Sequence, residues 1–350
     1  MSWIGPGFVD CHSHLIAVAA GETELLDPTS VASYHRQLQA RGSSPMDVPH
    51  VPQVPDLDSA IEQVLFGARQ LGIVEFHEAG LGNWEHLDAL TRLCEQDRLP
   101  IRVRVFLRSG VADVSKMRRF GAERLEILGV KFYADGWIGP RTCALAHPFS
   151  DQPENAGVLF ADADTLVRRI TPFANAGWQI ATHAIGDRAI QEVVDAYERI
   201  YGSDCAAQRP RIEHAQVTTP ELVARIAELG IVCCIQPSFA VSDATSAKAA
   251  LGARFATAYD WPAMLAAGVK IITGSDYPIE TQDPLTGLQH LVTGAAVGGE
   301  PAAGAKPLDL TTALQLMTDP AAGTVTLSAD PATVPNDSLH QLQVLSASPL

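Results

Sequence analysis

WQIATHAIGDRAIQEVVDAYERIYGSDCAAQRPRIEHA, residues 178–215, carries the pattern from which the fold class can be inferred. A short apolar stretch (Trp178–Ala184) leads into a segment of helical spacing (Asp187–Tyr201), and a second apolar stretch follows (Pro210–Ala215). A strand, a helix and another strand in this order are typical of a parallel β-α-β unit. The sequence therefore predicts an α/β protein built on a parallel sheet.

The same alternation continues on both sides of this stretch. Eight short β-rich segments recur, separated in most cases by segments of helical spacing. The segments are Gly7–His14, Gly72–Gly80, Ile101–Arg108, Leu128–Asp135, Trp178–Ala184, Pro210–Ala215, Ile231–Gln236 and Val269–Asp276. One intervening helix, Pro220–Leu229, is bounded by Thr219 as N-cap and Gly230 as C-cap. Eight such units predict a closed (β/α)8 TIM barrel over residues 1–320.

Two regions do not follow this alternation of strand and helix. Residues 15–60 include a Pro-rich stretch and are expected to form a long excursion above the first strand. Residues 321–350 contain two β-like pieces, Thr324–Leu327 and Gln341–Leu345, which are predicted to pair as a reduced β-ribbon at the barrel edge.

The composition excludes several classes of protein. The 350 residues include 25 Lys+Arg and 40 Asp+Glu, and this net charge of −15 argues against a nucleic-acid-binding surface. No apolar run reaches the roughly 18 residues of a membrane span, so no membrane partner is expected. Six cysteines without a CxxC pair, and no signal-peptide pattern, indicate a cytoplasmic protein with reduced thiols.

Histidines and one aspartate lie where predicted strands end. His12 and His14 are two residues apart, so strand alternation places both imidazoles on the same side. His183, His214 and Asp276 lie at the ends of the fifth, sixth and eighth segments. Because the carboxyl ends of barrel strands meet at one mouth, we expect these five side chains to gather there around a metal ion. The alternative at each position is local, either a hydrogen-bonded core histidine or an aspartate that caps a helix.

Lys131 lies inside the otherwise apolar segment Leu128–Asp135, where a buried ammonium group would be costly. Burial favours the free amine, which is able to react or to bind CO2. We therefore place Lys131 in the candidate site. The alternatives are a salt bridge to Asp135 and a solvent-exposed position at the strand end.

Five further residues are expected to line the mouth and contact a small-molecule substrate. They are His77, Trp137, Arg141, Gln236 and Tyr277. Arg141 would hold a substrate carboxylate or polarise a carbonyl, with a loop salt bridge as the alternative. Trp137 and Tyr277 would form an aromatic wall, or would simply cover loop backbone. Glu213 immediately precedes His214, so alternation predicts that it faces away from the metal, where it would support a neighbouring element.

Several blocks of the chain resemble those of a known family. The blocks are PGFVDCHSHL (6–15), VKFYADGWIGPRTCAL (130–145), ATHAIGDRAI (181–190), RIEHAQ (211–216) and TGSDYPIETQDPLTGL (273–288). In this order they resemble the amidohydrolase superfamily, and most closely its family 3 branch, which includes N-substituted formamide deformylases. The resemblance extends from residue 5 to about residue 320 and implies a metal-dependent hydrolase on a (β/α)8 barrel.

The resemblance also implies a role for each candidate ligand. His12, His14 and Asp276 would hold one Zn2+, and His183 and His214 a second, with Lys131 bridging them as its carbamate. Asp276 would also handle the proton of the attacking water, so the expected catalytic residues are Asp276, Lys131 and Arg141. Imidazole and carboxylate suit Zn2+, and two cations about 3.5–4 Å apart can share and acidify one water.

The chain departs from this family in two places. Relatives carry a small β-sandwich formed before and after the barrel, whereas this chain begins close to the first barrel strand. We therefore expect the N-terminal part to be missing and residues 321–350 to be its C-terminal remnant. Relatives also have a longer insertion where this chain has residues 15–60, so the walls of the substrate pocket are expected to differ. The uncovered barrel surface suggests a homodimer.

The predicted function is hydrolysis of a C–N bond, of amide or N-formyl type, in a small organic substrate. The main alternative keeps the barrel and metal but uses them for a lyase, isomerase or cyclisation step, because the same Lewis acid stabilises an enolate. A non-catalytic binding protein on the same frame is the third hypothesis.

Overall fold

The computed structural model describes residues 2–22, 28–47, 54–120 and 123–350. Within this part of the chain, ten strands form one sheet in the order β10-β9-β1-β2-β3-β4-β5-β6-β7-β8. The strands are β1 (Trp3–Ser13), β2 (Ile73–Leu81), β3 (Arg102–Arg108), β4 (Leu125–Tyr133), β5 (Gln179–Ala184), β6 (Arg211–His214), β7 (Val232–Ile235), β8 (Lys270–Thr273), β9 (Thr318–Leu327) and β10 (Val344–Pro349).

The first eight strands follow one another in sequence order, and each pairs in parallel with the next. Each matches one of the eight segments predicted from apolar, β-rich composition. The expectation of a parallel α/β fold is therefore confirmed. Side chains from successive strands fill the interior, and Phe8, Phe76, Phe106 and Phe132 are all buried.

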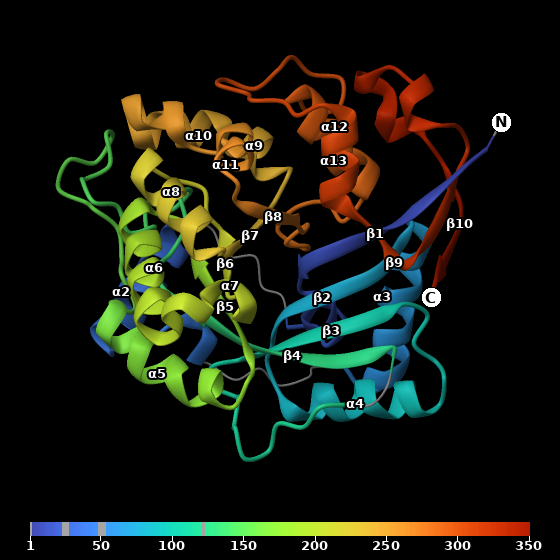
Figure 1. Cartoon of the computed structure of the whole chain (residues 1–350), viewed down its shortest axis with the longest axis horizontal. Coiled ribbons are helices and arrows are strands. Elements are labelled where there is room, and N and C mark those ends of the chain that lie inside the picture. The colour runs from blue at the N-terminus through green and yellow to red at the C-terminus, as the bar shows by residue number, and fades with distance from the viewer. Residues whose placement is uncertain (1, 23–27, 48–53, 121–122) are drawn as a thin grey trace.

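Helices surround these strands in Figure 1. The α-helices are α1 (Leu15–Ala19), α2 (Pro28–Ala40), α3 (Leu57–Gln70), α4 (Trp84–Glu95), α5 (Ala163–Asn175), α6 (Asp187–Tyr201), α7 (Cys205–Gln208), α8 (Pro220–Leu229), α9 (Phe239–Ser242), α10 (Ala244–Leu251), α11 (Trp261–Ala266), α12 (Pro284–Thr293) and α13 (Leu310–Met317). The 3-10 helices are η1 (Pro45–Asp47), η2 (Gly202–Asp204), η3 (Gly252–Thr257), η4 (Pro331–Thr333) and η5 (Asn336–Gln341). Among the described residues, no helix combines the length and apolar character that crossing a membrane requires.

Local capping explains why α8 has the bounds predicted for it. The Thr219 side chain accepts a hydrogen bond from the backbone N–H of Leu222, and Pro220 occupies the first turn. Gly230 ends the helix in the left-handed region, with φ of +65°. Helix α6 also has its predicted bounds, and its buried face includes Val193 and Val194.

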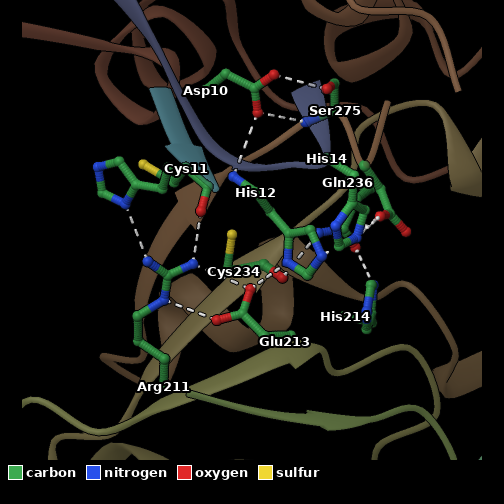
Figure 2. A network of polar contacts seen from close by, with 12 residues as sticks. Asp10, Cys11, His12, His14, Arg211, Glu213, His214, Cys234, Gln236 and Ser275 are labelled. Carbon is green, nitrogen blue, oxygen red and sulfur yellow. Dashed lines mark hydrogen bonds and ion pairs between the residues drawn. The ribbon is translucent and has the colours of Figure 1, made fainter. Parts of the chain in front are cut away.

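The end of β1 lies against the residues that follow β8. The Asp276 backbone N–H donates to the His12 carbonyl oxygen at 2.7 Å, and the His14 N–H donates to the Tyr277 carbonyl oxygen at 2.9 Å. The carboxylate of Asp10 accepts hydrogen bonds from both the backbone N–H and the hydroxyl of Ser275 (Figure 2). The first and last parallel strands are therefore joined at their carboxyl ends.

The predicted excursion over residues 15–60 is more regular than expected. Its described part holds α1, α2, η1 and the start of α3, while residues 23–27 and 48–53 of the predicted segment lie outside the described residues. The sequence rich in Ser, Thr and Pro resembles a loop, but tertiary contacts stabilise helices here. Asp47 pairs with Arg169 of α5, and its other contacts tie η1 to Ser44 and Ser109.

The predicted pairing of two C-terminal strands is confirmed, but their bounds differ. β9 begins at Thr318 and not at Thr324, and β10 covers Val344–Pro349 and not Gln341–Leu345, because Gln341 ends η5. Strand β9 pairs antiparallel with both β1 and β10, and lies beside β1 in Figure 1. Val325 and Leu327 are buried, so one face of the ribbon joins the core. Arg69 of α3 and Arg102 of β3 donate to the carbonyl oxygens of Ala347 and Ala321, which attaches the ribbon to the main body.

Candidate metal centre

Four imidazoles and one carboxylate come together where β1, β5, β6 and β8 end. The ring centroids of His12 and His14 are 5.4 Å apart, and those of His183 and His214 are 4.5 Å apart. One ligand atom each of His12, His214 and Asp276 lies within 4.8 Å of the other two. Figure 2 shows His12, His14 and His214 close together. The structure thus gathers the five strand-end residues that the sequence assigned to one site.

Asp276 links both histidines of β1. Its Oδ1 lies 3.4 Å from His12 Nε2 and 3.2 Å from His14 Nε2. Burial alone would raise the pKa of Asp276, but the neighbouring imidazoles of His12 and His14 hold it well below its usual range. The side chain is therefore a carboxylate, which is the form that binds a cation.

Two of the histidines have Nδ1 engaged by the protein, which leaves Nε2 for an ion. Nδ1 of His12 lies 2.5 Å from Glu213 Oε2. Nδ1 of His214 lies 2.8 Å from Gln236 Oε1. In each case the partner oxygen accepts the Nδ1 proton, which makes Nε2 the lone-pair nitrogen that a metal can bind.

His183 has the opposite arrangement. Its Nε2 donates to the carbonyl oxygen of Gly136 at 2.9 Å, and its Nδ1 is buried with no hydrogen-bond partner among the described residues. The ring stacks on Tyr133 with centroids 3.7 Å apart. Burial lowers the pKa of His183 well below its usual value, so the imidazole is neutral. A buried nitrogen lone pair without a partner fits a metal ligand.

Lys131 is almost fully buried on β4, with 1% of its surface exposed. Burial lowers the pKa of its ammonium group, although the negative charges of Glu213 and Asp276 oppose this shift. The alternative salt bridge to Asp135 is wrong. The Asp135 carboxylate instead accepts hydrogen bonds from the backbone N–H groups of Ile185, Gly186 and Ala144.

Glu213 was expected to face away from the metal, and this prediction is wrong. The two neighbours Glu213 and His214 both reach the site because His214 has φ of +76°, outside the extended region. This twist breaks the strand alternation on which the prediction depended. Glu213 consequently points at His12 from within the sheet, while His214 takes its place among the ligands.

Gln236 and His77 were expected to contact substrate, but the structure gives both of them protein partners. The Gln236 amide accepts from His214 and donates to the Cys234 carbonyl oxygen at 3.3 Å, so it orients a ligand histidine. His77 lies mid-strand on β2, with Nε2 3.1 Å from Glu75 and Nδ1 3.1 Å from Arg211. Both of its ring nitrogens are therefore occupied.

Arg141 makes the loop salt bridge that was the alternative to a substrate-binding role. Its guanidinium pairs with Asp151, with the shortest N–O distance at 2.6 Å. The remaining N–H groups donate to the carbonyl oxygens of Ile138 and Gly139 and to Ser246. These contacts use the guanidinium N–H groups of Arg141 that a substrate carboxylate would otherwise bind.

The two predicted aromatic wall residues are both half-buried. Trp137 meets the ring of His35 from α2 edge to face, with centroids 4.7 Å apart. Tyr277 follows Asp276 directly, and its carbonyl oxygen accepts from His14. Trp137 therefore packs in the loop after β4, and Tyr277 adjoins the ligands through its backbone.

Two polar residues that support the candidate ligands were not predicted. Glu78 Oε1 lies 3.5 Å from His14 Nδ1, and Arg211 forms two hydrogen bonds to Glu213, whose supporting role was expected. A signal was available for Arg211, because it alternates with Glu213 along the buried strand β6. Charges on the interior of a sheet require partners, and ligand histidines are natural ones.

Comparison with known proteins shows a family. The amidohydrolase family model matches residues 47–329. YtcJ of Bacillus subtilis (strain 168) is 36% identical over 178 residues, which are 51% of this chain and 33% of that protein. N-substituted formamide deformylase of Arthrobacter pascens is 26% identical over 189 residues, which are 48% of this chain and 35% of that enzyme. The matched segments thus span about a third of these curated relatives.

A solved structure shares the fold. An uncharacterized metal-dependent hydrolase from Pyrococcus horikoshii OT3 superimposes with a TM-score of 0.75 at 20% identity, covering 96% of this chain and 88% of that one. This likeness and the parallel sheet show the shared fold. The chain belongs to the amidohydrolase family.

Proposed function

We propose that the protein hydrolyses a C–N bond, of amide or N-formyl type, in a small organic molecule. The observation that carries this proposal is the cluster of His12, His214 and Asp276 ligand atoms within 4.8 Å, beside the unpartnered Nδ1 of His183. The backbone hydrogen bonds between the end of β1 and residues 276–277 favour closure of the eight parallel strands into a (β/α)8 barrel around this cluster.

The donor set of imidazole nitrogens and a carboxylate oxygen fits Zn2+, held by His12, His14, His183, His214 and Asp276. When bound, one or two such ions would lower the pKa of water toward about 7 and polarise a substrate carbonyl. Lys131 is proposed to join the set as its carbamate, since burial lowers the pKa of its ammonium group and the free amine is the form that reacts with CO2.

Residues of the chain would orient the ligand histidines and transfer the proton. Glu213 and Gln236 hold their histidines at Nδ1 and thereby keep Nε2 directed into the site. Asp276 is ionised and lies between two imidazoles, so its carboxylate is placed to accept a proton at Oδ1 and to deliver it to the leaving nitrogen. Arg141 forms a salt bridge with Asp151, and we propose that it also contacts the substrate.

The likeness to a formamide deformylase supports the N-formyl class, while the shorter 15–60 segment supports a pocket of different shape. The six cysteines are all unpaired thiols, which supports a reducing, cytoplasmic location. We also propose that the protein acts as a homodimer, which sedimentation at micromolar concentration would test.

The test is turnover of a panel of N-formyl and N-acyl amines by the zinc-loaded protein in 18O-labelled water. We expect release of amine with 18O in the carboxylic acid product. Turnover without incorporation of label would contradict hydrolysis and favour a lyase, isomerase or cyclisation step. Zinc-loaded protein that releases amine from no member of the panel would contradict the proposed bond class.

A further inference from the structure

Arg211 of β6 is among the largest completely buried side chains, yet it lies outside the proposed ligand set. Its guanidinium donates from Nε to Glu213 Oε1 at 2.7 Å and from Nη2 to Glu213 Oε2 at 3.0 Å. Nη2 also donates to the Cys11 carbonyl oxygen at 2.7 Å. One cation therefore holds both the carboxylate that contacts His12 and the backbone just before His12, as Figure 2 shows.

The Glu213 carboxylate, held by Arg211, in turn fixes the orientation of the His12 imidazole. Glu213 Oε2 lies 2.5 Å from His12 Nδ1, while His12 Nε2 faces Asp276 Oδ1 at 3.4 Å. A carboxylate accepts and cannot donate, so the proton of the neutral ring stays on Nδ1. The tautomer of His12 is thus determined by a group that Arg211 holds in place.

His12 is shared by two possible ligand groups. One is His12, His214 and Asp276, and the other is His12, Glu213 and Cys234; in each, the three ligand atoms lie within 4.8 Å of one another. Nδ1 of His12 faces Glu213, whereas Nε2 faces Asp276. An ion bound by Nδ1 together with Glu213 and Cys234 would therefore lie outside the site that contains Asp276. A soft thiolate and a carboxylate beside an imidazole are themselves acceptable zinc ligands.

We propose that Arg211 and Glu213 are positioning residues that direct the metal ion to His12 Nε2, together with His214 and Asp276, and away from Glu213 and Cys234. Arg211 occupies both oxygens of Glu213, so this carboxylate serves as an acceptor for His12 and not as a ligand. This inference rests on the metal dependence in the proposed function but concerns where the ion binds, not which bond is cleaved.

A matched control exists on β2. Glu75 is also a well-buried interior carboxylate with two arginine partners, Arg102 and Arg104, at 3.1 and 3.3 Å. It contacts none of the proposed metal ligands, and its link to Arg211 is indirect, through His77, whose Nδ1 lies 3.1 Å from Arg211 Nη1. Glu75→Gln therefore disturbs a neighbouring ion network while the Arg211–Glu213–His12 contacts stay in place.

The experiment compares Zn2+ affinity of the wild-type protein, Glu213→Gln and Glu75→Gln by competition with a chromophoric chelator. We expect Glu213→Gln to bind Zn2+ about 10- to 100-fold more weakly, the range for loss of a group that orients a ligand histidine. Glu75→Gln is expected to change the affinity less than about twofold, because its partners do not reach the ion. Wild-type affinity in Glu213→Gln, or an equal loss in Glu75→Gln, would overturn the proposal.

Two spectroscopic measurements test the proposal independently of metal affinity. In 15N-histidine-labelled, zinc-loaded wild-type protein, His12 is expected to carry its proton on Nδ1, and a proton on Nε2 would overturn the proposal. With Cd2+ in place of zinc, no thiolate charge-transfer band is expected, and a band absent from Cys234→Ser would likewise overturn it. A wild-type protein that binds neither ion would contradict the proposed function as well, whereas binding at the Cys234 side contradicts this inference alone.

Discussion

Both the backbone and the side chain of Asp276 contact the histidines of β1. Its N–H binds the carbonyl of His12 while its carboxylate faces Nε2 of both His12 and His14. The residue has φ of +57°, a left-handed conformation that Asp and Asn tolerate better than most residues. Asp is therefore favoured here both by charge and by backbone conformation.

Asp276→Asn keeps the size and the left-handed tolerance but removes the negative charge. We expect kcat with the best substrate of the panel to fall by about 10²- to 10⁴-fold, the usual worth of a positioned proton carrier. Asp283→Asn is the matched control, because Asp283 caps α12 in the same loop and its amide replacement can still cap. Steady-state kinetics at saturating zinc measures both, and equal losses in the two variants would argue against a special role for Asp276.

Single variants of Arg141 and Asp151 can distinguish a salt-bridge role of Arg141 from a role in substrate binding. If the salt bridge is the main function, Arg141→Gln and Asp151→Asn should lower kcat/KM by similar, small factors, less than about tenfold. A substrate carboxylate bound by Arg141 would instead give a large rise in KM in Arg141→Gln alone. Kinetic constants of the two single variants, with circular dichroism as a folding control, distinguish these outcomes.

The gathering of the candidate ligands could be predicted because each lies at or just after a strand end, and parallel strands bring their ends together. Their partners could not be predicted to the same degree. Glu213 was assigned to the wrong face because the positive φ of His214 is invisible in a sequence pattern. Gln236 lies at the end of β7 as expected, but only coordinates reveal that His214 already occupies its amide oxygen. His77 was placed at a strand end, whereas β2 continues to Leu81 and Glu75 and Arg211 contact its ring.

Helix α2 shows where an element depends on distant contacts. His35 on this helix is buried, with Nδ1 3.0 Å from the Thr142 hydroxyl and its ring against Trp137 and Phe160. Helix α2 has 13 residues, a length that is marginal for an isolated helix in water, so packing of this kind contributes much of its stability. The eight strands, by contrast, are encoded locally by their apolar, β-branched residues and were all predicted.

The attachment of α2 is expected to weaken in mild acid. Burial lowers the pKa of His35 from 6.5 to about 4, so between these values the unfolded segment binds a proton that the packed one excludes. The contribution of His35 is thus complete above the ordinary histidine pKa and is lost as the pH falls toward about 4, costing about 1.4 kcal/mol at about pH 5.5.

Hydrogen exchange of residues 31–40 at about pH 5.5 and 7.5, corrected for intrinsic rates, measures this effect. Wild-type protection should fall at the lower pH by about tenfold, the equivalent of that cost. His35→Gln, which keeps a polar contact but does not titrate, should lose this pH dependence. The same pH dependence in His35→Gln would show that another group is responsible.

The molecule as a whole should be stabilised by the ion it is built to hold. The candidate ligands come from the ends of β1, β5 and β6, from the residues after β8 and from Lys131 on β4, so one ion would cross-link strands distant in the sequence. At a free zinc concentration 100 times Kd, the native state gains about 2.7 kcal/mol.

Thermal unfolding of chelator-treated protein, before and after addition of Zn2+, tests this prediction. We expect Tm to rise with zinc concentration in the wild-type protein. The double variant His183→Asn and His214→Asn should show little or no rise, because it lacks two of the proposed ligands. An equal rise in both proteins would place the stabilising ion elsewhere.

The hydrogen bond from Asp276 to His12 also has a consequence for biosynthesis. A nascent chain carries the two β1 histidines some 260 residues before their carboxylate partner is synthesised. Until then the growing polypeptide offers these imidazoles without their acidic counterpart. The candidate metal site can therefore be completed only after residue 276 has emerged from the ribosome.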